Sequence, residues 1–239
     1  MSKKAPLPSL ALLAGGLAKR LRPITEQIPK SMVEVAGAPF IAHQLRLCVR
    51  QGIKDVVVCA GYLANQIETY AGNGEKFGIN LRYSIDWPVL LGTGGALKKA
   101  LPLLGAEFFV MYGDSYLDIE FAPVYDAFVR SRKAALMTVF LNKNQWDTSN
   151  VEFADGEIRH HDKVNRTAKM QFIDYGLGLF RAEVFAHWPR DKPFDLADVY
   201  AALIKQANVA GYEVSKRFYE IGTQAGLTET AEMLRTLSN

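Results

Sequence analysis

The sequence has few cysteines, little net charge and no long apolar run, and each shortage excludes a class of protein. Only 2 of the 239 residues are cysteine, too few for a small secreted domain held together by disulfides. The formal net charge is only +3 and the basic residues are spread along the chain, so a nucleic-acid partner is not expected. No apolar segment approaches the ~18 residues that a membrane-spanning helix needs. We therefore expect a protein that binds neither nucleic acid nor membrane.

The two cysteines and the start of the chain indicate a cytoplasmic protein. Cys48 and Cys59 fall in apolar segments predicted to be helix and strand, where a thiol behaves as a small buried hydrophobe. The N-terminal apolar segment is interrupted by Gly15 and Gly16, which makes it a poor signal peptide. A chain of 239 residues is long enough for one large α/β domain, and we expect a single domain over 1–239. Its oligomeric state, monomer or homodimer, stays open.

Apolar strands alternate with amphipathic helices in the first part of the chain. The strands are predicted from β-branched and apolar runs at 10–13, 55–60, 79–85, 107–112 and 134–140. The helices are predicted from apolar residues at helical spacing over 38–50, 63–70, 92–104 and 121–130. This order of elements requires a largely parallel sheet with helices on both faces.

The second part of the chain has a different pattern. Short alternating stretches over 147–181, with Asp155-Gly156 as a hairpin turn, predict antiparallel structure. Helices over 196–206 and 224–236 flank a short strand over 218–221. The fold class is therefore α/β, a Rossmann-like, mostly parallel sheet flanked by helices with a small mixed or antiparallel subdomain. We divide it into a half over about 9–145 and a second half over about 146–239.

The stretch from residue 11 to residue 32 combines a strand, a glycine turn and a group of cations. Gly15 and Gly16 follow the first predicted strand, and without a Cβ their backbone can lie close to a ligand. Only one acid, Glu26, accompanies the cations Lys19, Arg20, Arg22 and Lys30. This combination favours a binding site for phosphates. A tight turn followed by a solvated basic surface is the alternative that the composition leaves open.

Two acids stand where strands of the predicted sheet end. Asp114 follows the strand at 107–112, and Glu220 follows Phe218-Tyr219. Ligands of open parallel sheets bind beyond these carboxyl ends, and a carboxylate left unpaired there is costly. A magnesium ion between the two acids would remove that cost, because magnesium takes oxygen ligands. The alternative is structural, with Asp114 capping the next turn and Glu220 paired with a lysine.

Taken together, the motifs resemble one enzyme family. They are GGLAKRLRPIT at 15–25, PKSM at 29–32, GTGGA at 92–96, GDS at 113–115, Asp162-Lys163 and EIGT at 220–223. Occurring in this order from residue 10 to about 230, they resemble the sugar-1-phosphate nucleotidyltransferases. Those enzymes join a nucleoside triphosphate to a sugar 1-phosphate and release pyrophosphate. The resemblance implies the same two substrates, a magnesium cofactor and the fold of the nucleotide-diphospho-sugar transferases.

The resemblance also implies roles for the matched residues. Contacts to base and ribose are expected from Leu13, Ala14, Gly15, Gly16 and Gly92. Arg20 would hold the triphosphate, Lys30 would neutralise phosphate charge near the reacting centre, and Asp114 and Glu220 would bind magnesium. Lys163 would bind the phosphate of the sugar substrate, whose sugar would contact Asn150, Asp174 and Gly176.

The implied reaction needs no general base, since a sugar phosphate is already ionised at neutral pH. Positioning and electrostatic stabilisation are then the whole mechanism. The sequence agrees, because its four histidines form no catalytic pattern, and we expect them on the surface or in helices.

Three departures from the family pattern bear on the substrate. Ala18-Lys19 replaces the usual Gly-Thr, Glu220 stands for an aspartate, and Asp174-Tyr175-Gly176 replaces Asn-Ala-Gly. The last change alters the polarity of the sugar pocket and argues against a common glucose phosphate.

Several acceptors and bases stay open. No C-terminal hexapeptide-repeat β-helix is expected, which leaves the short members of the family. LLGTGGALKKAL at 90–101 resembles most the heptose-1-phosphate guanylyltransferases, which implies GTP and D-glycero-α-D-manno-heptose 1-phosphate, in a pathway to cell-surface polysaccharide. The alternatives are uridylyl, thymidylyl or cytidylyl transfer to N-acetylmuramic acid 1-phosphate, mannose or glucose 1-phosphate, or phosphocholine. A regulatory module that binds a nucleotide sugar without turnover is the alternative of another class.

Overall fold

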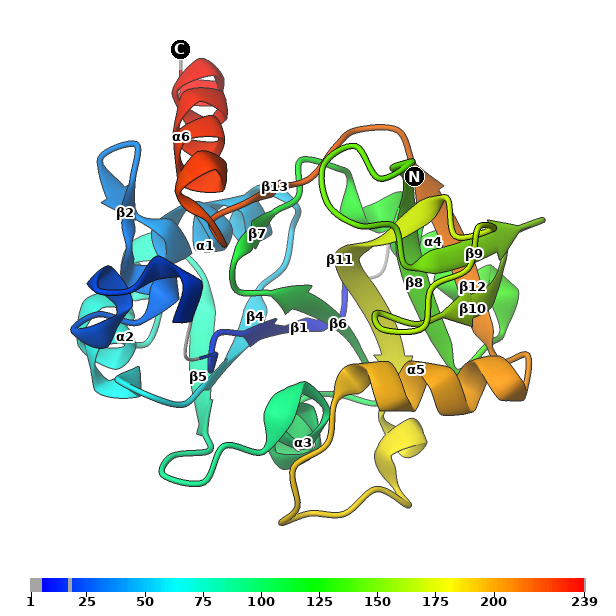
Figure 1. The fold of residues 1–239 in the computed structure, drawn as a ribbon. Helices are drawn as coiled ribbons and strands as arrows, with labels where there is room; N and C mark the ends of the chain where they lie inside the picture. The colour runs from blue at the N-terminus through cyan, green and yellow to red at the C-terminus, as the bar shows by residue number, and fades with distance from the viewer. Residues whose placement is uncertain (1–5, 17–18, 239) are drawn as a thin grey trace, which may run out of the picture.

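The apolar run near the start of the chain forms an interior strand of a large sheet. The computed structural model describes residues 6–16 and 19–238. Strand β1 (Ser9–Leu13) pairs in parallel with β4 (Asp55–Ala60) on one side and with β6 (Glu107–Tyr112) on the other. Strand β5 (Asn80–Ile85) extends the sheet beyond β4, also in parallel. Because these strands are parallel, their carboxyl ends share one edge of the sheet (Figure 1).

The second half continues the same sheet with a change of direction. Strand β11 (Phe172–Arg181) runs antiparallel between β6 and β8 (Ala135–Leu141). Beyond β8 lie the parallel strand β12 (Val209–Val214) and the antiparallel strands β10 (Glu157–His161) and β9 (Val151–Ala154). The predicted hairpin is confirmed, since Asp155 and Gly156 join β9 to β10 with positive φ angles. The mixed α/β fold expected from the sequence is therefore confirmed.

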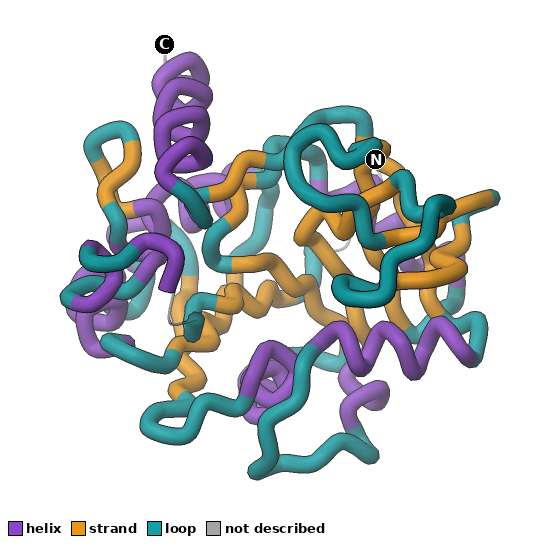
Figure 2. Tube along the Cα trace, viewed as in Figure 1, coloured by secondary structure: helices purple, strands orange, loops and turns teal. Residues whose placement is uncertain are grey.

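Helices cover both faces of the sheet, as the element order requires (Figure 2). One face packs against α1 (Phe40–Arg50), α2 (Ala64–Ala71), α4 (Phe121–Ser131) and α6 (Gln224–Ser238), the other against α3 (Gly92–Ala100) and α5 (Leu196–Lys205). Alternate residues of one strand serve the two faces, so Leu10 and Leu12 join the first core and Ala11 the second. No helix in the described ranges has the length and apolar character to cross a membrane.

Several of the smaller elements lie near the edge of the sheet where the parallel strands have their carboxyl ends. Two short two-stranded sheets pair β2 (Glu34–Val35) with β3 (Ala38–Pro39) and β7 (Ser115–Tyr116) with β13 (Tyr219–Glu220). Single turns of 3-10 helix occur at Lys19–Leu21, Ile24–Glu26, Lys30–Met32, Glu75–Phe77, Leu101–Leu103 and Ala182–Phe185. The β7–β13 pair brings Glu220 opposite Ser115, which is adjacent to Asp114.

Some predicted boundaries are wrong for local physical reasons. The helix predicted over 92–104 ends at Ala100, and Pro102 lies in the 3-10 turn that follows; proline lacks the N–H that an α-helix needs. The helix predicted over 38–50 begins only at Phe40, after Pro39. Strand β12 was not predicted, because VAGYEV alternates weakly and contains a glycine.

The cysteine prediction is confirmed and one histidine prediction is wrong. Cys48 and Cys59 are both buried, and burial raises the pKa of each thiol to about 12. His161, expected on the surface or in a helix, is a strand residue with 7% exposure. Burial lowers its pKa, so the neutral imidazole packs edge-on against Tyr200.

Candidate active site

The candidate site begins where β1 and β6 end side by side. The Gly113 N–H donates to the Leu13 carbonyl at 2.9 Å, which ties the two strand ends together. The Ala14 N–H donates in the same way to the Cys59 carbonyl at 2.8 Å. Gly113 therefore brings Asp114 beside the glycine turn that follows β1.

Replacing Gly113 by alanine is expected to lower stability and disturb this edge. A Cβ at position 113 would lie 2.5 Å from the Leu13 carbonyl oxygen and 3.0 Å from the Ala14 Cα, so the two strand ends must separate. Overpacking of this kind costs about 1–3 kcal/mol, or roughly 2–4 °C in melting temperature per kcal/mol. Gly105→Ala is the matched control, because its Cβ meets only ordinary contact distance. Thermal melting of the two variants measures the difference, and equal melting temperatures would contradict the close approach.

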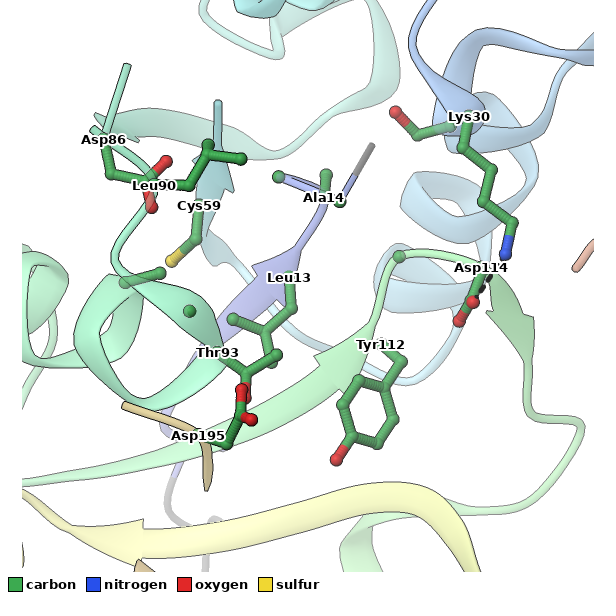
Figure 3. A pocket seen from close by; sticks show the side chains of 16 residues that line it. Leu13, Ala14, Lys30, Cys59, Asp86, Leu90, Thr93, Tyr112, Asp114 and Asp195 are labelled. Atoms are coloured by element: carbon green, nitrogen blue, oxygen red, sulfur yellow. Dashed lines mark hydrogen bonds and ion pairs between the residues drawn. The ribbon is translucent and has the colours of Figure 1, made fainter. Parts of the chain in front are cut away.

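A first pocket of about 400 Å³ opens beyond the ends of β1, β4 and β6 (Figure 3). Its lining includes the residues predicted to contact base and ribose, namely Leu13, Ala14, Gly15, Gly16 and Gly92. Lys30 and Asp114 lie at one end of it. The structure thus brings together residues that are far apart in the sequence, as the parallel sheet predicts.

A cluster of cations and acids surrounds this end of the first pocket. Lys30 Nζ donates to Asp114 Oδ2 at 2.7 Å, and the two side chains are 15% and 33% exposed. A Cβ on Gly222 would lie 3.2 Å from an Arg20 Nη atom, 3.3 Å from Glu220 Oε1 and 3.4 Å from Lys30 Nζ. The glycine of the EIGT motif therefore leaves room for three charged groups to meet.

A second pocket of about 420 Å³ lies on the other side of Asp114. Its lining includes the residues predicted to contact the sugar phosphate, namely Asn150, Lys163, Asp174 and Gly176, and also Glu220, which was predicted to bind magnesium. Tyr112 and Asp114 line both pockets. The two predicted halves of the site thus share a border.

Hydrogen bonds to neighbouring backbone fix the sugar-side residues. The Asn150 side-chain oxygen accepts from the Asp174 N–H, and Asp174 Oδ1 accepts from the Gly176 N–H, both at 3.0 Å. Lys163 extends from a turn held by Asp162, which accepts the N–H groups of Val164 and Asn165. These hydrogen bonds lower the pKa of Asp162.

The negative charges of the carboxylates in the site make the ionisation of neighbouring acidic groups less favourable. The pKa of Glu220 is raised, first by burial and then by the neighbouring charges of Asp114 and Asp147. Tyr112, between the two pockets, has a pKa well above its usual value because it is buried near Asp174 and Asp114. Burial and these neighbouring carboxylates therefore outweigh the opposite effect of Lys30 and Arg20 on Glu220.

Gly92 lines the first pocket, and the fold gives it a second constraint. Its φ is +71°, and a Cβ there would lie 2.6 Å from the Phe194 carbonyl oxygen. The N–H groups of Gly94 and Gly95 donate to that same oxygen at 3.0 and 3.2 Å. The GTGGA motif thus joins the start of α3 to the segment before α5.

The cations of the glycine-turn segment do not share one environment. Arg22 forms an exposed pair with Glu26 at 3.7 Å, so for Arg22 the solvated-surface alternative is correct. Leu17 and Ala18, and the side chain of Lys19, lie outside the described residues. Arg20 and Lys30 alone among these cations approach Glu220 in the part of the chain that the structure describes.

The sequence analysis missed several residues that line the pockets. In the first pocket they are Asp86, Thr93, Tyr112 and Asp195, and in the second Asp147 and Arg166. Asp86 directly follows β5, so the rule that singled out Asp114, a polar residue at the end of a parallel strand, would have found it. Asp195 caps α5 from a loop, and nothing in its local pattern indicates a pocket.

A comparison with known protein families identifies the family of this chain. The model of the nucleotidyl transferase family matches residues 11–235. The chain belongs to this family. The match includes both pockets and the strands that support them.

Two curated relatives and one solved structure show the degree of sequence and structural similarity. The chain is 30% identical over 91% of its length to an N-acetylmuramate α-1-phosphate uridylyltransferase of Neisseria meningitidis, 94% of which is covered. It is 29% identical over 88% of its length to a D-glycero-α-D-manno-heptose 1-phosphate guanylyltransferase of Campylobacter jejuni, 93% of which is covered. A crystal structure from Bacillus anthracis, assigned as a glucose-1-phosphate thymidylyltransferase, superposes with a TM-score of 0.85 at 20% identity, over 95% of each chain. The enzyme class expected from the motifs, a sugar-1-phosphate nucleotidyltransferase, is confirmed, whereas the relatives differ in base and in sugar.

Proposed function

We propose that this enzyme transfers a nucleotidyl group from a nucleoside triphosphate to a sugar 1-phosphate, with magnesium, and releases pyrophosphate. The observation that carries the proposal is the shared border of the two pockets at Asp114. A nucleotide in the first pocket and a sugar phosphate in the second would meet there, beside Lys30 and Arg20. Holding the two polyanionic substrates side by side would place the attacking phosphate oxygen next to the α-phosphorus, which makes the reaction effectively unimolecular.

The cations of the cluster would reduce the electrostatic repulsion between the two substrates. A phosphate oxygen of the sugar phosphate attacks the α-phosphorus, and the bond from that phosphorus to the pyrophosphate leaving group breaks. Negative charge grows on the α-phosphate oxygens and on the leaving group. Lys30 stabilises the former and Arg20 the latter in this proposal, since fixed cations are effective where charge develops. No side chain has to remove a proton.

Asp114 and Glu220 fit a magnesium ion. Magnesium in such enzymes takes one or two carboxylates and completes its shell with phosphate oxygens and water. Within 6–16 and 19–238 no group of three or more His, Cys, Asp or Glu forms a complete site, which agrees with a metal that arrives with the nucleotide. The raised pKa of Glu220 marks negative charge that a cation would offset. When bound, the ion would supply further stabilisation of phosphate charge.

The second pocket favours an acceptor whose only negative charge is its phosphate. Lys163 and Arg166 are its cations, whereas Asp147 and Asp174 are carboxylates outside the proposed metal pair. With the cations on the phosphate, these two carboxylates face the sugar and accept hydrogen bonds from hydroxyl groups. A polyhydroxy sugar phosphate such as heptose 1-phosphate fits this lining, and N-acetylmuramate, which carries a carboxylate of its own, fits less well. A role in cytoplasmic nucleotide-sugar synthesis for surface polysaccharide follows from the same proposal.

A substrate grid tests the proposed function. Five nucleoside triphosphates are combined with a panel of sugar 1-phosphates and phosphocholine, with and without magnesium, and pyrophosphate release is measured. We expect release with at least one sugar 1-phosphate, and none without a divalent cation. Tight nucleotide binding by calorimetry with no release from any pair would instead favour a non-catalytic binding module.

Glu220→Gln is expected to stabilise the free protein while impairing catalysis. Because the pKa of Glu220 is raised, its ionised form costs free energy in the folded state at pH values above that pKa. Glutamine removes this cost, so without magnesium the melting temperature should rise at pH 8. The gain should shrink as the pH falls from 8 into the acidic range, because protonation of the native carboxyl removes the same cost. Thermal melting across this pH range checks the sign, and a gain that grows on acidification would contradict it.

A further inference from the structure

Asp86 is a buried carboxylate that the proposed chemistry does not use. It directly follows β5 and is only 7% exposed, yet it lines the first pocket. Figure 3 shows it on the side of the pocket opposite the Lys30–Asp114 pair. If the phosphates lie at Lys30 and Asp114, the other end of the nucleotide, its base, lies at Asp86.

The carboxylate of Asp86 is fixed on one side and free on the other. Oδ2 accepts the Leu91 N–H at 2.9 Å. Oδ1 would lie 3.0 Å from a Cβ on Gly61 and 3.7 Å from one on Gly15, so it points toward the glycine turn. In the described part of the chain no donor hydrogen-bonds to Oδ1 and no cation pairs with the carboxylate. A buried anion without such a partner is costly, and a ligand that donates hydrogen bonds removes that cost.

The other carboxylates of the first pocket are already engaged. Asp114 is paired with Lys30. Asp195 is exposed, caps α5 in a capping box with Asp198, and accepts from the Thr93 hydroxyl at 3.4 Å. Asp86 is therefore the acidic acceptor left for the ligand at the base end.

The hydrogen-bonding edge of one base matches a carboxylate. Guanine presents two adjacent donors, N1–H and the 2-amino group, which can be accepted by the free Oδ1 and by the second acceptor site of Oδ2, beside its bond to the Leu91 N–H. Uracil and thymine present one N–H between two carbonyl oxygens, and a carboxylate repels those oxygens. Adenine and cytosine present an amino group next to a ring nitrogen that is itself an acceptor. We infer that Asp86 reads the base and selects guanine, so that the nucleoside triphosphate is GTP; this inference rests on the proposed function.

The test is direct nucleotide binding by calorimetry with magnesium and no sugar phosphate, using GTP, inosine triphosphate and UTP. Inosine keeps N1–H but lacks the 2-amino group. We expect the native enzyme to bind GTP about 10-fold more tightly than inosine triphosphate and on the order of 10²-fold more tightly than UTP, because a site built to accept hydrogen bonds rejects analogues that lack the donors.

Asp86→Asn changes the proposed contact to the base but can keep the hydrogen bond that holds residue 86 in the fold. The amide oxygen can still accept the Leu91 N–H, while the NH₂ group presents a donor to the base. We expect the preference for GTP over UTP to fall by on the order of 10²-fold and the difference between GTP and inosine triphosphate to shrink to about 2-fold. Asp118→Asn is the control, since Asp118 lines neither pocket, and it should leave both ratios unchanged.

The outcomes separate the two proposals. Tighter binding of UTP than of GTP by the native enzyme, or unchanged ratios in Asp86→Asn, overturns the assignment of guanine. If Asp86→Asn does not fold, the comparison of GTP with inosine triphosphate in the native enzyme decides alone. Selective GTP binding without pyrophosphate release from any acceptor supports the base assignment and counts against the proposed reaction. Absence of binding by all three nucleotides overturns both.

Discussion

Asp114→Asn is expected to lower kcat by on the order of 10³-fold or more. Asp114 lines both pockets and pairs with Lys30 at 2.7 Å, so its charge serves the proposed metal and also orients a cation. Asparagine has nearly the same shape, and the backbone around it is held by the Gly113–Leu13 hydrogen bond. The loss should therefore appear in turnover while the melting temperature changes little.

Asp118→Asn is the matched control for this variant. Asp118 pairs with Arg50 and Lys216 at 3.7 and 2.9 Å and lines neither pocket. Surface pairs contribute about 0–1 kcal/mol, so its turnover should stay within about 2-fold of the native value. Pyrophosphate release with saturating magnesium measures both variants. Turnover by Asp114→Asn close to that of the control would refute the assignment of Asp114 to the metal.

Lys30→Ala is expected to lower kcat by about 10²–10³-fold, the range found when one fixed donor to a developing charge is removed. Lys30 is the cation that lies at the border of the two pockets in direct contact with Asp114. In the proposed complex Asp114 would hold magnesium, and the Lys30 ammonium group would then contact the α-phosphate. The loss should then fall on kcat, with no rise in the magnesium concentration that gives half-maximal rate.

A structural role for Lys30 predicts a different result. If Lys30 served only to hold Asp114 in place, its removal would weaken magnesium binding, and excess magnesium would restore turnover. A magnesium titration of Lys30→Ala distinguishes the two roles. Lys216→Ala is the control for loss of a lysine, because Lys216 forms an exposed pair with Asp118 and neither residue lines a pocket.

Local sequence patterns were sufficient for much of the fold and for the outline of the site. The run DVVVCA becomes β4 as predicted, because β-branched residues suit a strand buried on both faces. Glycines and acids after strand ends predicted a ligand edge, since parallel strands end on one side of a sheet. Lys30, Asp114 and Glu220 could be predicted from their motifs. No motif by itself, however, indicates how close these three residues lie to one another in the fold.

Other features depend on contacts between distant segments, which no local pattern encodes. Strand β12 forms because β8 offers it a parallel partner, although its own alternation is weak. His161 is buried because β10 packs its ring against Tyr200 of α5. Gly92 must be glycine because the Phe194 carbonyl, about 100 residues later in the chain, occupies the space of a Cβ.

The sequence by itself determined the alternation of strands and helices, the family, and the cations and acids that we propose for phosphate binding. Those properties follow from residue type and short-range spacing. The tertiary structure alone decided that Asp114 borders both pockets and that Asp86 lines the first pocket with one carboxylate oxygen free. Both depend on which strand ends are neighbours in the sheet, and the pairing of β1 with β4 and β6 is settled by packing across the whole domain.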